Sequence, residues 1–103
     1  MATPENKVKA AVVKLLNKYS AYYFFPATHG YGRSGVPDIV CCLKGKFLAI
    51  ECKAGSGKTT ALQDREIHKI RTAEGSAMVV NEDNMALLEQ VLKELTHDQG
   101  EKQ

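Results

Sequence analysis

Apolar residues recur at intervals of three and four along three stretches of the chain, and this spacing is typical of amphipathic helices. The first stretch covers about residues 4–19, where Thr3 suits the N-cap position just before it. The second covers about residues 60–73 and the third residues 85–95. The pattern therefore predicts three helices, each with one buried face. The polar residues from about 97 to 103 are expected to form a frayed tail.

Four shorter stretches are rich in β-branched, aromatic and other apolar residues, which is typical of strands. They lie at residues 21–25, on both sides of Lys44-Gly45, and at residues 77–80. The elements therefore follow the order α-β-β-β-α-β-α. A helix between the last two strands suggests a crossover connection, which makes the sheet mixed. The sequence predicts a single α/β domain over residues 1–103 with a mixed central sheet flanked by helices.

The central two strands, within residues 35–53, bring three charged residues to one point. If their loop is Lys44-Gly45 alone, Leu43 pairs with Lys46, and the same register places Asp38 directly opposite Glu51. Directly opposite residues share a face, with Cβ atoms about 5 Å apart. Lys53 projects from that face too, because strand side chains alternate. Two adjacent carboxylates favour a divalent cation between them; the alternative is a buried ion-pair network, which is uncommon on a strand pair.

Both faces of this hairpin are apolar away from its charged end, so helices are expected on each side of the sheet. One face carries Ile39, Cys41, Leu43, Leu48 and Ile50; the other carries Val40, Cys42, Phe47 and Ala49. Adjacent Cys41 and Cys42 point to opposite faces and cannot share one zinc ion. Free cysteines in apolar strands are usually buried, so burial is predicted for all three, including Cys52. Unpaired cysteines also indicate a reducing cytoplasm.

Two loops contain basic residues near the charged cluster. The glycine-rich loop from Ala27 to Gly35 contains Arg33, which is either a solvated loop residue or a phosphate contact. Residues 54–60 resemble a P-loop but have Cys52 where that motif requires glycine, so the motif is rejected. Lys58 in this loop stays a candidate contact for a nucleic-acid backbone.

The composition is that of a compact globular domain and does not by itself identify a binding partner. Lys and Arg exceed Asp and Glu by 14 to 12, for a net charge of +2. This balance does not indicate nucleic-acid binding unless the basic residues cluster. The longest apolar run is far too short to span a membrane, and the N-terminal residues lack the apolar segment of a signal peptide.

Asp38 followed by Glu51-Cys52-Lys53, on this order of elements, resembles the PD-(D/E)xK nuclease superfamily. The glycine-rich loop before Pro37-Asp38, with Glu5 and Gln63, narrows the resemblance to the VRR-NUC family, the virus-type replication-repair nuclease module. The match covers about Pro4 to Val80, and the small size resembles that of stand-alone, phage-encoded members. The resemblance implies a restriction-endonuclease-like core.

The resemblance also implies a role for each matching residue. Asp38, Glu51 and the backbone carbonyl of Cys52 match the metal ligands, and the expected metal is Mg²⁺ or Mn²⁺. Lys53 matches the catalytic lysine and Gln63 the glutamine that supports the site. Glu5 matches the N-terminal acidic residue, although a carboxylate there also suits the helix dipole. Lys53 either acts as a general base or stabilises developing charge, and the sequence leaves both roles open.

The function implied is a metal-dependent, structure-specific DNA endonuclease that acts as a homodimer, like a Holliday junction resolvase. A phage-encoded protein in the cytoplasm of its host is the expected setting. Branched DNA is the expected partner, with phosphate contacts from Arg33, Ser34, Lys58 and Lys44, and from Lys46 as a further candidate. The alternatives are a flap or general endonuclease, and a non-catalytic subunit that binds DNA or assists assembly.

Overall fold

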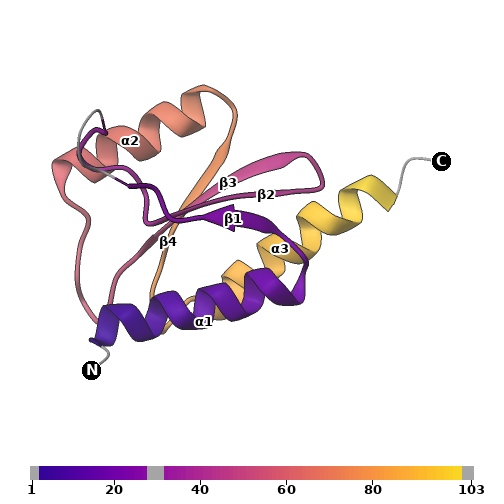
Figure 1. The fold of residues 1–103 in the computed structure, drawn as a ribbon, viewed down its shortest axis with the longest axis horizontal. Coiled ribbons are helices and arrows are strands. Elements are labelled where there is room, and N and C mark those ends of the chain that lie inside the picture. The colour runs from indigo at the N-terminus through magenta and orange to yellow at the C-terminus, as the bar shows by residue number, and fades with distance from the viewer. Residues whose placement is uncertain (1–2, 28–31, 101–103) are drawn as a thin grey trace.

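The computed structural model describes residues 3–27 and 32–100, and it has three layers (Figure 1). The predicted glycine-rich loop lies outside the described residues over 28–31, as does the end of the predicted tail over 101–103. Helices α1 and α3 lie on one side of a four-stranded sheet and α2 lies on the other (Figure 1). The predicted α/β fold class and the order of elements are confirmed. The elements are α1 (Pro4–Lys18), β1 (Tyr22–Phe24), β2 (Ile39–Leu43), β3 (Lys46–Cys52), α2 (Ala61–Thr72), β4 (Ser76–Val80) and α3 (Met85–Gly100).

The sheet is mixed, as predicted, with the strand order β1-β2-β3-β4. Strands β1, β2 and β3 are antiparallel neighbours, and α2 forms the crossover that makes β4 parallel to β3. Leu43 pairs with Lys46 across a two-residue turn. Lys44 and Gly45 both have positive φ, 54° and 81°, which is the geometry of a type I′ hairpin turn. The predicted register is therefore confirmed.

The main core lies between the sheet and the α1/α3 layer. Val12 and Leu16 of α1 and Leu88 and Leu92 of α3 are fully buried against the inward residues of the strands. Burying one such side chain contributes about 1.5–3 kcal/mol, so this layer supplies most of the apolar stabilisation. A smaller cluster on the opposite face holds α2 through Ile67, which packs with the small residues Ala49 and Ala77.

Two predictions about the ends and faces of elements were wrong. Helix α3 does not end at Leu95 but continues to Gly100, because no glycine or proline interrupts residues 96–99 and polar residues are tolerated on an exposed helix. Cys42 is exposed, whereas Cys41 and Cys52 are buried as predicted. The reason is that α2 covers the β3–β4 half of its face and leaves Cys42 of β2 open.

Candidate active site

The hairpin register brings Asp38 and Glu51 together at the end of the sheet. One carboxylate oxygen of Asp38, Oδ2, accepts a hydrogen bond of 2.9 Å from the backbone N–H of Cys52. This bond holds the side chain of Asp38 against β3. Because the N–H and carbonyl of a strand residue point to the same side, the Cys52 carbonyl also faces Asp38.

Glu51 is the buried centre of the cluster, with only 2% of its surface exposed. Its Oε2 accepts a hydrogen bond of 2.8 Å from Gln63 Nε2 and lies 3.7 Å from the ammonium of Lys53. Its other oxygen, Oε1, is buried without a hydrogen-bond partner. Burying a carboxylate oxygen without a partner costs free energy, so a hydrogen-bond donor or a cation at this atom would stabilise the site.

The electrostatics of Glu51 agree with this geometry. Burial and the neighbouring carboxylate of Asp38 raise the pKa of Glu51 to about 7, and Lys53 offsets part of this rise. The carboxylate of Glu5, in the first turn of α1, also contributes to the higher pKa. Five predicted site residues therefore lie in one electrostatic cluster: Asp38, Glu51, Lys53, Gln63 and Glu5.

Gln63 joins the cluster to the start of α2. Its Nε2 donates to Glu51, and its Oε1 accepts a hydrogen bond of 2.9 Å from the backbone N–H of Thr60. The Thr60 hydroxyl in turn accepts from the backbone N–H of Gln63, which completes a capping box. One side chain therefore both begins the helix and orients the buried carboxylate.

The cluster has the oxygen ligands that Mg²⁺ and Mn²⁺ prefer. Asp38, Glu51 and the Cys52 carbonyl are the candidate ligands, and the unpartnered Oε1 of Glu51 fits a cation. In residues 3–27 and 32–100, no three His, Cys, Asp or Glu side chains are grouped to hold a metal. The candidate ligands at this cluster are instead two carboxylate side chains and one backbone carbonyl. The Cys52 thiol is no candidate, because burial raises its pKa to about 12.

The predicted DNA contacts are not gathered at this cluster. Lys44 is exposed at the hairpin turn, the far end of β2 and β3 from Asp38, about 20 Å away at the usual rise per strand residue. Ser34 is exposed on the loop before Asp38, and Lys58 is exposed on the loop after Lys53. Arg33 has a protein partner, since its Nε donates to Glu66 Oε1 at 3.1 Å. Contact between these residues and DNA stays a prediction.

Glu66 is the residue of this region that the sequence analysis missed. It is 3% exposed, although a glutamate on a helix is usually solvated. The available signal was its position, four residues from both Leu62 and Ile70, which places it on the predicted apolar side of the helix.

Comparison with known proteins gives two matches. Residues 12–94 match the model of a family described as archaeal Holliday junction resolvase (Hjc). The fold is similar to a solved structure described as a VRR_NUC domain, with a TM-score of 0.69 and 21% sequence identity, over 91% of this chain and 95% of that chain. No curated protein matches the sequence significantly. The predicted VRR-NUC-type, restriction-endonuclease-like fold is therefore confirmed.

Proposed function

The chain belongs to the archaeal Holliday junction resolvase (Hjc) family, and on this premise we propose that it is a metal-dependent endonuclease that cuts branched DNA. The observation that carries the proposal is the cluster of Asp38, Glu51 and Lys53, with one oxygen of Glu51 buried and unpartnered. Glu51 also lies beside a second carboxylate, that of Asp38, so a divalent cation at its unpartnered oxygen would offset both charges.

The residues of the cluster have separable roles in phosphodiester hydrolysis. Asp38, Glu51 and the Cys52 carbonyl would hold Mg²⁺ or Mn²⁺, which supplies charge neutralisation at the phosphate and acidifies water. Gln63 fixes the orientation of Glu51 through its 2.8 Å hydrogen bond. Lys53, with a side chain that is 14% exposed, is placed either to take a proton from water or to stabilise charge on the phosphate.

Family membership supports a four-way junction as the substrate. We expect the protein to introduce paired cuts in two opposed strands of a synthetic junction in the presence of Mg²⁺. Mapping both labelled products at single-nucleotide resolution tests this expectation, and raising the salt concentration should weaken binding steeply because phosphate contacts dominate. Single unpaired nicks with a preference for flaps would indicate a flap or general endonuclease. Binding without cleavage would indicate a non-catalytic subunit.

Paired cuts need two active centres, and a twofold dimer supplies them with fixed spacing. The uncovered part of the sheet supports this assembly. Tyr22 is 69% exposed and pairs with exposed Cys42, which in turn pairs with Phe47, itself 43% exposed. Phe24, 47% exposed, lies on the same face in the neighbouring row. A contiguous apolar surface of this kind marks an interaction site, and we propose a second copy of the chain as its occupant.

Charged residues on this face should therefore produce monomers. We expect Tyr22→Glu and Cys42→Glu each to weaken dimerisation by at least about tenfold, since burying an unpaired charge costs several kcal/mol. Light scattering over a range of protein concentrations measures the effect. Leu87→Glu is the matched control, because Leu87 is 54% exposed on α3, away from this face.

The thiol of Cys42 gives a second, independent measurement. Burial raises the pKa of Cys41 to about 11 and that of Cys52 to about 12, so a thiol reagent should label Cys42 first. Labelling should slow as the wild-type protein is concentrated. A wild-type protein that stays monomeric at every concentration, alone and on DNA, would rule out the dimer and leave the nuclease proposal standing.

A further inference from the structure

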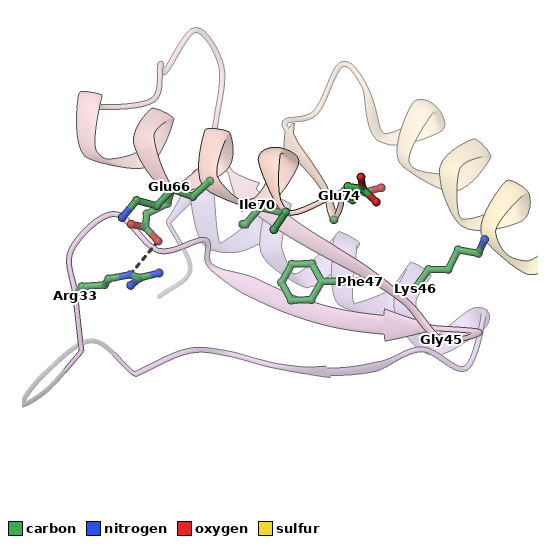
Figure 2. Close-up of a pocket in the computed structure, with 11 residues that line it drawn as sticks. Arg33, Gly45, Lys46, Phe47, Glu66, Ile70 and Glu74 are labelled. Atoms are coloured by element: carbon green, nitrogen blue, oxygen red, sulfur yellow. Dashed lines mark hydrogen bonds and ion pairs between the residues drawn. The ribbon is translucent and has the colours of Figure 1, made fainter.

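An ion pair between an exposed arginine and a buried glutamate connects the loop before Asp38 to helix α2. The Nε of Arg33 donates to Glu66 Oε1 at 3.1 Å, as the dashed line in Figure 2 marks. The side chain of Glu66 is 4% exposed, whereas that of Arg33 is 64% exposed. The other oxygen, Glu66 Oε2, is buried without a hydrogen-bond partner and lies 3.7 Å from the guanidinium of Arg65. A buried carboxylate is stable only beside a cation, and the Arg33 guanidinium supplies that charge together with a hydrogen bond to Glu66.

The same loop contacts the helix at a second point. A Cβ added to Gly35 would lie 2.5 Å from the carbonyl oxygen of Leu62, and Gly35 has a φ of +83°. Only glycine fits this approach. Leu62 and Glu66 are one helical turn apart, so the two contacts fix both the position and the direction of the loop on α2. Pro37, which is buried, then leads directly into Asp38.

Helix α2 in turn holds the second carboxylate of the cluster. Gln63, one turn before Glu66, donates to Glu51 at 2.8 Å. The hairpin register sets the backbones of Asp38 and Glu51, and helix α2, through Gln63, orients the carboxylate of Glu51. The Arg33–Glu66 pair ties this helix to the loop that leads into Asp38, although neither residue belongs to the cluster itself.

We propose that Arg33 and Glu66 form a positioning pair that sets the separation of the Asp38 and Glu51 carboxylates. This inference rests on the proposed function, because the separation matters most if a metal binds between them. It gives Arg33 a role different from the phosphate contact expected from the sequence. The hydrogen bond to Glu66 uses one of the five N–H donors of Arg33, so any phosphate contact would have to come from the exposed part of the guanidinium.

The test is a double-mutant cycle with Arg33→Gln, Glu66→Gln and the double variant. We expect each single variant to lower kcat at saturating DNA by about tenfold to a hundredfold, since small misplacements in an active site have effects of this size. The kcat of the double variant should be no lower than that of either single variant, because the two residues act as a unit. DNA affinity and its salt dependence should stay near the wild-type values. Arg33→Lys, which keeps the cation, should restore part of kcat.

Arg65→Gln is the matched control. It removes an arginine that also lies near Glu66 but comes from α2 itself, so it cannot tether the loop. We expect less than about a twofold change in kcat for this variant, because its 3.7 Å contact is not a hydrogen bond and Glu66 keeps its hydrogen bond to Arg33. Should Arg33→Gln fold poorly, Glu66→Gln and the double variant still test the pair, since neither leaves a buried unpaired carboxylate.

A readout without cleavage separates this inference from the proposed function. The Mg²⁺ concentration that gives half-maximal thermal stabilisation should rise in Arg33→Gln and Glu66→Gln, and stay unchanged in Arg65→Gln. An inactive wild-type protein would contradict the proposed function, while this shift would still support the positioning role. An unchanged Mg²⁺ requirement in Arg33→Gln and Glu66→Gln would overturn the positioning role. Equal and additive losses of DNA affinity in the two variants, with a salt slope reduced by about one, would overturn it too.

Discussion

Replacing Asp38 with asparagine or Glu51 with glutamine should lower DNA cleavage by about a thousandfold or more and leave DNA binding largely intact. Each change removes one negative charge from the candidate metal ligands without changing their size. Loss of the charge stabilisation that a metal provides is worth several kcal/mol in the transition state, and each 1.4 kcal/mol is a factor of ten. Single-turnover cleavage of a labelled junction in Mg²⁺ measures the effect.

The matched control is Asp83→Asn, which removes an exposed carboxylate in the turn before α3. It should cleave at nearly the wild-type rate, with circular dichroism showing the same fold for all three variants. Excess EDTA should abolish cleavage by the wild-type protein, and added Mg²⁺ or Mn²⁺ should restore it. Full cleavage in EDTA, or an active Glu51→Gln variant, would contradict the assignment of these carboxylates.

The geometry of this pair was predictable because it depends on local rules. The alternation of side chains along β2 and β3 has a period of two, so one turn fixes every pairing in the hairpin. Lys44-Gly45 supplies that turn, with both φ angles positive. The side chain of Asp38 then reaches the backbone of Cys52, one residue beyond Glu51, as the register requires.

The features that the sequence did not predict depend on which part of the sheet a helix covers. Ala49 and Ala77 let α2 approach β3 and β4 closely, so Cys42, on β2 toward the other edge, stays exposed. No periodicity within β2 distinguishes a covered apolar residue from an uncovered one. The ion pair of Glu66 was not predictable from the sequence either, because its partner Arg33 comes from a loop that is distant in sequence.

The last prediction uses the raised pKa of Glu51 and needs no cleavage assay. The pKa is about 7 in the folded protein, against an ordinary value of 4.5, so the folded state binds the proton more tightly. The metal-free protein should therefore lose stability as the pH rises from about 4.5 to 7, since unfolding then releases a proton. Glu51→Gln stays neutral throughout and should avoid this loss.

Below pH 4.5 the two proteins should have similar stability, and by pH 8 the metal-free Glu51→Gln variant should be more stable by about 3 kcal/mol, or roughly 15 °C in Tm. At pH 8, Mg²⁺ should make the wild-type protein more stable than Glu51→Gln, because the metal stabilises only a protein that binds it. Thermal unfolding at both pH values, with EDTA or Mg²⁺, measures all four cases, and Glu94→Gln, on the exposed side of α3, is the matched control. Equal stability of wild type and Glu51→Gln at pH 8 in EDTA would show that the buried carboxylate is satisfied without a cation, which would remove the main support for a metal between Asp38 and Glu51.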